Sequence, residues 1–301
     1  MFNAEGMTLP AFIAVLVFAA AAPCAAGSVI RDDASDVASQ GLAAGFTSAA
    51  RFNIAGGVGS GTLVAPEWVL TAAHVVTDGV GAPLVTGTMT VTVNGESRSV
   101  LQIVPRPGWT GANYTMGVDL ALVRLSSPVL TAAPAMLASG GVPADQPVTV
   151  VGFGAFGFGS IGLTDSSGVL RAVTNVYDVS APTLYPSWSP SLALMDFDAP
   201  GTALYNRSGA VDATALEGSP AIGDSGGGSF TLLGGVWVLT GVHSFTFTTA
   251  AGAAAPFGYG TASADVLIAD HAAWIQSVIP GPGAAGLLCL ATVVGRRRRC
   301  A

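Results

Sequence analysis

The chain has 301 residues, half of them hydrophobic, only 10% charged and 40 of them glycine, which is typical of a β-rich globular protein of one large or two small domains. Its formal net charge is −7, and all 11 basic residues are arginine, four of them in the run 296–299. Because nucleic-acid binding depends on neutralising phosphates, the acidic remainder of the chain argues against a nucleic-acid partner.

Residues 1–28 have the features of a secretory signal peptide. An apolar stretch begins at 11–18, is too short for a comfortable membrane span and is followed by small residues. Cleavage is expected after Ala26, Gly27 or Ser28, since each cut leaves small residues at the two positions that determine signal-peptide cleavage. We therefore expect an exported protein, either extracellular or associated with the cell surface or envelope.

The sequence requires no disulfide, metal or cofactor in the body of the protein. Its cysteines are Cys24, Cys289 and Cys300, and all three lie in the terminal segments. Exported proteins often rely on disulfides, so this body is expected to be stabilised by its core alone. No cluster of carboxylates compels a metal, and we predict no cofactor.

Short β-like runs separated by turn residues fill the body of the chain. The clearest run, 89–93, alternates and ends at Asn94-Gly95, a dipeptide typical of a β-hairpin. Further strands are expected at 59–64, 67–71, 119–125, 147–151 and 237–242. Only residues 263–278 have the composition of a helix. The pattern predicts an all-β fold with one short closing helix. The Pro-rich segment 143–147 divides it into two parts, at about 29–142 and 143–262, which the resemblance described below implies are two antiparallel barrels.

The segment 223–228, Gly-Asp-Ser-Gly-Gly-Gly, can expose the hydroxyl of Ser225 on a turn where backbone amides approach a bound carbonyl. A serine hydroxyl needs a base to remove its proton and a carboxylate to orient that base. Upstream, His74 ends a Thr-Ala-Ala-His segment and Asp119 begins an Asp-Leu-Ala-Leu segment. Taken alone, His74 could be a structural histidine of the core, Asp119 could cap a strand and Ser225 could simply form a turn.

Together these three segments resemble the signatures of the trypsin/chymotrypsin-like serine proteases, over residues 29–279. The resemblance implies two six-stranded β-barrels and a monomeric endopeptidase that acts on protein or peptide substrates. It implies that Ser225 attacks the scissile carbonyl, that His74 carries the proton and that Asp119 orients the imidazole. The backbone N–H groups of Gly223 and Ser225 would form the oxyanion hole.

The resemblance also implies a role for Asp224, the residue before the nucleophile. In the family, a free apolar N-terminus folds inward and its ammonium pairs with this carboxylate, which acts as an activation switch. Cleavage after Ser28 would expose Val29 and Ile30 to make this pair. The alternative is that these two residues are simply the first strand of the mature chain.

Specificity is expected to depend on residues around the primary pocket. Ser219, six residues before the nucleophile, would lie at its base, and its neutral side chain argues against cleavage after Lys or Arg. Ser244 matches the position that binds the substrate backbone, and Thr246 lies at the pocket mouth. His243 resembles the histidine with which bacterial glutamyl endopeptidases bind Glu. The sequence predicts a neutral P1 residue, with Glu as the alternative if His243 is not merely structural.

Competing interpretations of the motifs remain. The segment 152–157 spells the G-x-G-x-x-G dinucleotide fingerprint, but no amphipathic helix follows it. In an α/β-hydrolase the catalytic residues follow the chain order serine, acid, histidine, which Ser225, Asp265 or Asp270, and His271 could supply. That fold also needs alternating strands and helices, which are not expected here. A catalytically silent surface-binding protein on the same fold, or an esterase with the same triad, stays an alternative function.

The tail 280–301 contains Pro and Gly, then an apolar run at 284–295, then the four arginines. The run is short for a stable membrane span. The pattern resembles the PEP-CTERM sorting tails of bacteria, which an exosortase cuts, although Gly281 stands where that motif has Glu. We expect transient membrane contact through this tail and processing by an exosortase-type enzyme. A plain C-terminal anchor is the alternative.

Overall fold

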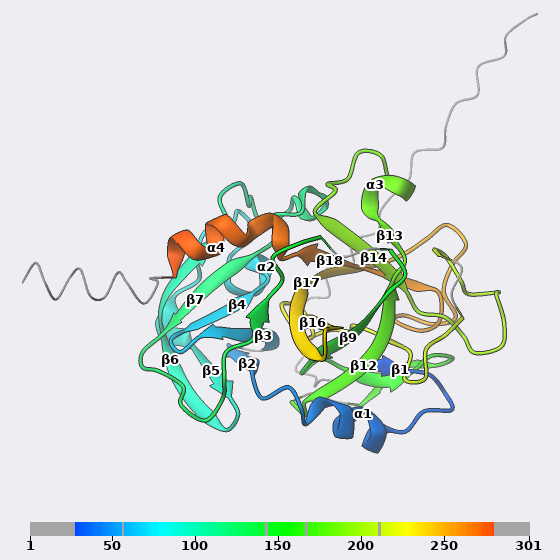
Figure 1. The fold of residues 1–301 in the computed structure, drawn as a ribbon, viewed down its shortest axis with the longest axis horizontal. Coiled ribbons are helices and arrows are strands. Elements are labelled where there is room, and N and C mark those ends of the chain that lie inside the picture. The colour runs from blue at the N-terminus through cyan, green and yellow to red at the C-terminus, as the bar shows by residue number, and fades with distance from the viewer. Residues whose placement is uncertain (1–27, 56, 142–143, 166–167, 210–211, 280–301) are drawn as a thin grey trace, which may run out of the picture.

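The computed structural model describes residues 28–279 apart from 56, 142–143, 166–167 and 210–211. The predicted signal peptide up to residue 27 and the predicted sorting tail lie outside the described residues. Two β units lie side by side, the first in blue to cyan and the second mainly in green to orange (Figure 1). No helix in the described part of the chain is long and apolar enough to cross a membrane.

The first unit is a closed barrel of six antiparallel strands in the order β2-β3-β4-β7-β6-β5. Buried side chains such as Phe52, Leu63 and Leu122 fill it. The predicted hairpin is confirmed, because β5 and β6 pair across Asn94 and Gly95, whose φ values of 44° and 82° suit a tight turn. The strands are β2 (Ala49–Ile54), β3 (Gly57–Ala65), β4 (Trp68–Thr71), β5 (Met89–Val93), β6 (Glu96–Pro105) and β7 (Ala121–Leu125).

The second unit is a half-barrel, in which strands pair in the order β12-β9-β16-β17-β18-β14-β13 and β8 adds to β17. The predicted all-β, two-barrel architecture is thus confirmed, although the pairing of this unit does not close and uses more than six strands. These strands are β8 (Met136–Leu137), β9 (Gln146–Gly152), β12 (Arg171–Tyr177), β13 (Val179–Ser180), β14 (Leu192–Asp196), β16 (Gly228–Leu233), β17 (Val236–Thr248) and β18 (Thr261–Leu267).

A small third sheet brings the start of the described chain against the second unit. Its order is β11-β10-β1-β15. Val29 pairs with Gly157 on one side and with Ser219 on the other, and it is fully buried. The strands are β1 (Val29–Ile30), β10 (Phe156–Phe158), β11 (Gly162–Asp165) and β15 (Gly218–Ser219). No helix follows the 152–157 glycines in this region, so the dinucleotide interpretation is excluded.

The helices are short and lie outside the sheets. The predicted helix 263–278 is wrong in its first half, because residues up to Leu267 form β18, a strand paired on both sides with almost every residue buried. Small side chains suit such a central strand, and their composition alone does not separate it from a helix. The helices are α1 (Asp36–Ala43), α2 (Ala73–Val76), α3 (Ala181–Leu184) and α4 (Ala272–Val278), with 3₁₀ turns η1 (Thr86–Thr88), η2 (Tyr114–Met116) and η3 (Ala269–His271).

Candidate active site

His74 and Asp119 meet because the strands that carry them are neighbours. His74 lies in α2, directly after β4, and Asp119 lies just before β7. β4 and β7 pair antiparallel with Thr71 opposite Ala121, so the end of one strand lies beside the start of the other. The two side chains are 45 residues apart in sequence yet share one edge of the first barrel.

The geometry of this pair orients the imidazole. Nδ1 of His74 lies 2.7 Å from Oδ2 of Asp119, and the backbone N–H of His74 donates to Oδ1 at 2.9 Å. Ser244 Oγ, on β17, also donates to Oδ2 at 2.6 Å. Asp119 is fully buried, whereas the His74 side chain keeps 22% of its surface exposed. The carboxylate therefore holds a proton on Nδ1 and leaves Nε2 free to face the cavity.

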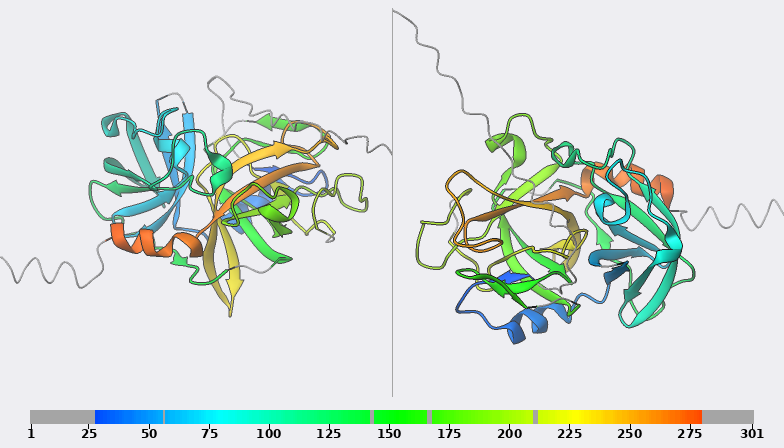
Figure 2. Two further views of the ribbon diagram at one scale, coloured as in Figure 1. Left: turned by 90° about the horizontal axis from the view of Figure 1, so that it is seen from above. Right: turned by 180° about the vertical axis from the view of Figure 1, so that it is seen from behind.

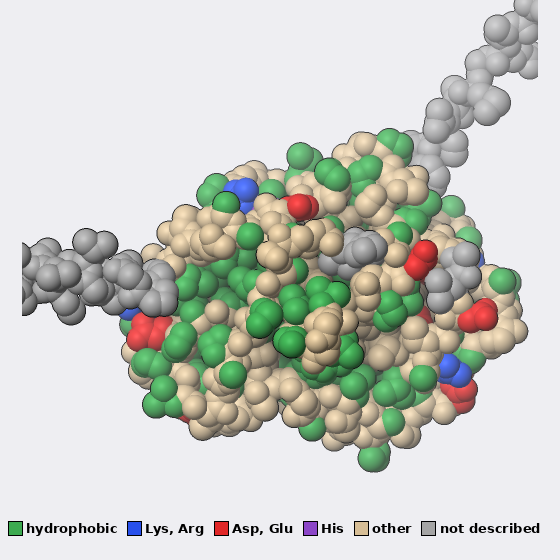
Figure 3. All heavy atoms as spheres, viewed as in Figure 1, with side chains coloured by type: hydrophobic (Ala, Val, Ile, Leu, Met, Phe, Trp, Pro, Cys, Tyr) green, Lys and Arg blue, Asp and Glu red, His purple; other side chains and the backbone are tan. Residues whose placement is uncertain are grey.

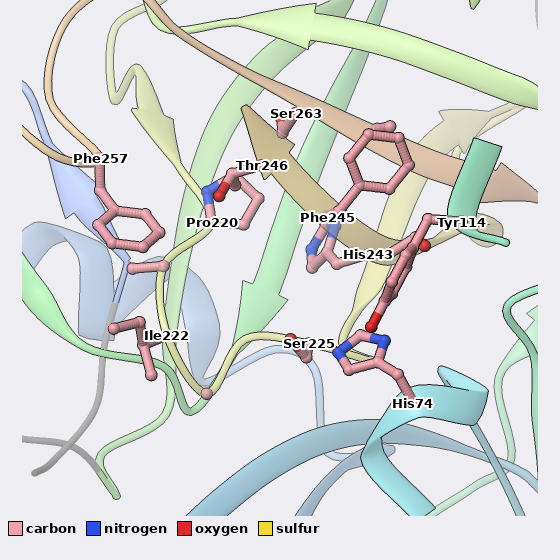
Figure 4. A pocket seen from close by; sticks show the side chains of 14 residues that line it. His74, Tyr114, Pro220, Ile222, Ser225, His243, Phe245, Thr246, Phe257 and Ser263 are labelled. Atoms are coloured by element: carbon pink, nitrogen blue, oxygen red, sulfur yellow. The ribbon is translucent and has the colours of Figure 1, made fainter. Parts of the chain in front are cut away.

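Ser225 comes from the second unit and lines the same cavity as His74. Figure 4 shows the two side chains next to each other. Ser225 lies in the turn before β16, and the next residue, Gly226, has φ +82°. A Cβ on Gly226 would overlap Thr71 Oγ1 and the carbonyl of Ser60. Only glycine fits this position, and its absent side chain lets the serine turn approach the histidine strand.

The amides expected to form the oxyanion hole are available. The N–H groups of Gly223 and Ser225 donate no hydrogen bond within the described residues. Ser60 fixes the turn from the first barrel, because its Oγ donates to the carbonyl of Gly223 at 2.8 Å and its N–H donates to that of Ser225 at 2.9 Å. Oγ of Ser60 in turn accepts from the N–H of Phe153. No motif singled out Ser60 in the sequence, since its role arises from the docking of the two units.

Asp224 is fully buried beneath this turn, and burial raises its pKa. Its carboxylate accepts from the N–H groups of Gly154 at 2.6 Å and Ala221 at 2.9 Å. The third donor is the hydroxyl of Ser28, at 3.1 Å. The sequence expected Val29 or Ile30 at this carboxylate, whereas both belong to β1 and the residue that reaches it is Ser28.

A cavity of about 330 Å³ opens beside the serine. Its walls include His243, Ser244 and Thr246, as expected, together with Phe257 and Ser263, which the sequence did not indicate. Ser219 is buried, its hydroxyl donates to the carbonyl of Pro220, and it is not among the lining residues. No Asp or Glu of the described chain lines the cavity.

His243 is held from behind by two buried groups. Its Nδ1 lies 2.6 Å from Asp265 Oδ1, and the hydroxyl of Tyr177 donates to Asp265 Oδ2 at 2.7 Å. The three residues are at most 3% exposed, and Nε2 of His243 has no partner in the described part of the chain. Burial lowers the pKa of His243, but the charges of Asp265 and Asp224 and the hydrogen bond to Asp265 outweigh it and raise the pKa.

This arrangement also decides against the α/β-hydrolase order. Asp265 is hydrogen-bonded to His243 and not to His271. Nδ1 of His271 instead accepts a hydrogen bond from Arg106 Nε at 3.1 Å. His271 is buried, and its pKa is lowered by burial and by the charge of Arg106. The fold lacks the alternating strands and helices that an α/β-hydrolase needs.

A row of aromatic side chains starts at His74, and its first two members, Tyr114 and Phe245, line the cavity. Tyr114 packs edge-on against His74 with ring centroids 5.5 Å apart, and Phe245 lies 6.0 Å beyond it. Trp188 follows at 5.5 Å and is stacked on Tyr185 at 4.2 Å. Burial and the charge of Asp119 raise the pKa of Tyr114 to about 12.

The comparisons with known proteins agree with this geometry. The profile of the family described as Trypsin matches residues 41–266. The chain belongs to the trypsin family. Among curated relatives, chymotrypsin-like elastase family member 1 of Macaca fascicularis is 29% identical over 198 residues, and that of Felis catus is 30% identical over 203 residues. Each alignment covers 62% of this chain and 66% of the relative, so the chain spans just under two thirds of their length.

A solved trypsin-family structure shows the shared fold. Neuropsin, described as a serine protease expressed in the limbic system of mouse brain, superimposes with a TM-score of 0.57 at 16% identity. The superposition covers 80% of this chain and 98% of neuropsin.

Proposed function

We propose that the chain is a serine endopeptidase that uses Ser225, His74 and Asp119 as its catalytic triad. The observation that supports this best is the buried Asp119 on Nδ1 of His74, whose ring faces the cavity that Ser225 also lines. Membership of the trypsin family, whose homologues are serine endopeptidases, agrees with it.

In the proposed reaction, Ser225 Oγ attacks the scissile carbonyl carbon while His74 Nε2 accepts its proton. The imidazolium then protonates the leaving amine, and an acyl-enzyme remains on Oγ. A water molecule, deprotonated by His74, releases the acid product and restores the serine. The free amides of Gly223 and Ser225 would stabilise the negative oxygen of each tetrahedral intermediate, roughly 3–4 kcal/mol for each donor.

Labelling with a fluorophosphonate probe, followed by cleavage of a peptide library, tests this function. We expect the wild type to be labelled and to cut peptides, and Ser225→Ala to do neither while melting at a similar temperature. A folded wild type that resists the probe would support the silent binding protein instead. Labelling with hydrolysis of esters but of no peptide would support the esterase.

We further propose that the primary pocket prefers Glu over Lys or Arg at P1. The pocket contains no carboxylate that could pair with a basic side chain, and hydroxyls of Thr246 and Ser263 lie on its walls. The unpartnered Nε2 of His243, backed by Asp265, could donate to a bound carboxylate. A neutral P1 residue is the second candidate, because a His–Asp pair is neutral overall and the pocket also has aromatic walls.

The P1 residues of the library cuts decide between these candidates. Glu at P1 in the wild type, lost selectively in His243→Ala while cuts after neutral residues persist, would support the acidic pocket. Cuts after Ala, Leu or Phe that do not change in His243→Ala would support the neutral pocket.

We also propose that export and maturation expose a new N-terminus at Ser28. Its side chain already lies on Asp224, so removal of residues 1–27 would place a free ammonium beside that buried carboxylate. At the other end, the tail is proposed to be cut by an exosortase-type enzyme. Mass spectrometry of the secreted, active protein tests both proposals. A mature chain that begins elsewhere than Ser28, or that retains the tail, would contradict the corresponding one.

A further inference from the structure

The hairpin of β16 and β17 projects from the second unit, as the yellow loop in the left view of Figure 2 shows. Its two strands meet at the Gly234-Gly235 turn. Leu232 pairs with Trp237, and Leu233 pairs with Val236. Since successive side chains of a strand point to opposite faces, one pair lies on each face of the tip.

All four side chains of this apolar tip are exposed, between 39% and 51% of their surface. Figure 3 shows hydrophobic side chains gathered over the hairpin, away from the charged groups at the edges of this face. The sequence between Asp224 and Asp265 contains no Asp, Glu, Lys or Arg. A solvent-exposed hairpin with apolar residues on both faces and no charges is unusual for a soluble monomer.

Only the base of the tip is covered by the protein itself. Trp237 packs against Phe46 with ring centroids 5.2 Å apart, and Phe46 also contacts Phe230. This support fixes the indole while leaving part of its surface to the outside. A flat protein partner would cover one face of the tip, whereas the interfacial region of a bilayer can surround both, and Trp is enriched there.

The sequence of the chain beyond the described residues also favours a bilayer as the partner of the tip. The helix α4 lies on the same side of the molecule as the hairpin, and the chain leaves it at Ile279 (Figures 1 and 2). A further 22 residues follow, with an apolar run at 284–295 and the arginines 296–299. Until the proposed cut removes it, a segment of this composition, too short to span a bilayer, would hold this side of the protein at the bilayer surface.

We propose that the hairpin tip inserts into the interface of a lipid bilayer and orients the enzyme on it. The strands fix the orientation, because β16 begins at the nucleophile turn and ends at the tip, and β17 returns to Ser244. At about 3.3 Å per residue, the tip lies roughly 15 Å beyond the start of β16. The tip is therefore the end of the hairpin far from the serine turn, and its insertion leaves the cavity free for protein substrates. Because the body is acidic, the contact is expected on zwitterionic lipid and in high salt.

Fluorescence quenching by brominated lipid tests the proposal on the full chain. The protein is mixed with vesicles of dioleoylphosphatidylcholine or of its dibrominated analogue, which quenches only indoles near the acyl chains. We expect quenching of the wild type and its loss in Trp237→Phe, whereas Trp188→Phe, changed beside the cavity, retains it. Equal quenching in wild type and Trp237→Phe would overturn the proposal, even if the tail binds the vesicles.

A second pair of variants measures affinity. Leu233→Ser/Val236→Ser is expected to lower vesicle partitioning of the full chain at least about fivefold, since two exposed apolar side chains lose their burial in lipid. Leu101→Ser/Leu204→Ser, at similarly exposed positions elsewhere, is the matched control and should leave partitioning unchanged. Equal partitioning of the two double variants would overturn the proposal. So would concentration-dependent dimerisation through the tip without any lipid binding.

Discussion

Asp178 lies at the end of β12 with its carboxyl against that of Asp196, and both are nearly inaccessible to solvent. Ser208 Oγ lies between them, 3.1 Å from Asp178 Oδ2 and 2.9 Å from Asp196 Oδ1. Burial, followed by the hydrogen bond and charge of Asp196, raises the pKa of Asp178 to about 9. The Asp178 carboxyl therefore keeps its proton at neutral pH.

This proton makes stability depend on pH in a definite direction. Between the ordinary pKa of Asp178, 3.8, and about 9, the folded chain binds a proton that the unfolded chain has lost. The stabilisation is complete below about pH 4 and is lost as the pH rises towards 9. Each pH unit in this window costs about 1.4 kcal/mol, which corresponds to roughly 3–5 °C in Tm for a domain of this size.

Asp178→Asn tests this reasoning because an amide has the shape and the donor of the protonated acid. Thermal melts between pH 5 and 7 should show a wild-type Tm that falls with pH, and a slope about 1.4 kcal/mol per pH unit smaller in the variant. Asp145→Asn, an exposed position, is the control and should keep the wild-type slope. Parallel slopes for wild type and Asp178→Asn would show that Asp178 is ionised in the folded protein, and would refute the argument.

Three further predictions concern the site. Ser60→Ala should lower kcat by roughly 10–100-fold with KM little changed, because the Gly223 carbonyl loses its hydrogen-bond donor. Ser97→Ala is the control, and a normal kcat in Ser60→Ala would contradict the role of Ser60 in positioning the turn. Asp265→Asn should lower cleavage after Glu at least about tenfold, and the loss should grow as the pH rises, since the charge of Asp265 raises the pKa of His243. An unchanged pH profile in a P1-Glu assay would argue against this. Gly226→Ala should abolish fluorophosphonate labelling, because the added Cβ overlaps Thr71. Gly87→Ala, whose Cβ would lie in open space, is the control and should be labelled normally. Normal labelling of Gly226→Ala would show that the turn can adapt.

The strands could be predicted from sequence where their patterns are local. The run 89–93 with its Asn94-Gly95 turn needs no tertiary information, and the structure confirms it. β18 could not be recognised, because a strand buried on both faces loses the alternation that identifies strands and here has small residues that also suit a helix. The closure of a barrel depends on non-local pairing, which no local pattern encodes.

The residues of the candidate site also divide into those that a local motif identifies and those that only tertiary contacts reveal. His74, Asp119 and Ser225 lie in short motifs, so they could be named in advance. Ser60 and Asp265 act only through partners far away in the sequence, Gly223 and His243 respectively. The contact of Ser28 with Asp224 depends on the pairing of β1 with β10 and β15, which no local pattern encodes. Such contacts follow from packing and not from composition.

The docking of the two units has a consequence for when the site forms. The histidine and its carboxylate belong to one unit and the serine turn to the other. At their junction Ser60 and Gly226 position the serine turn, and Ser244 donates to the carboxylate of Asp119. Under the proposed function, neither unit contains a complete triad, so activity would arise only when the two units dock. A substitution at the junction could therefore abolish activity while each unit keeps its own strands.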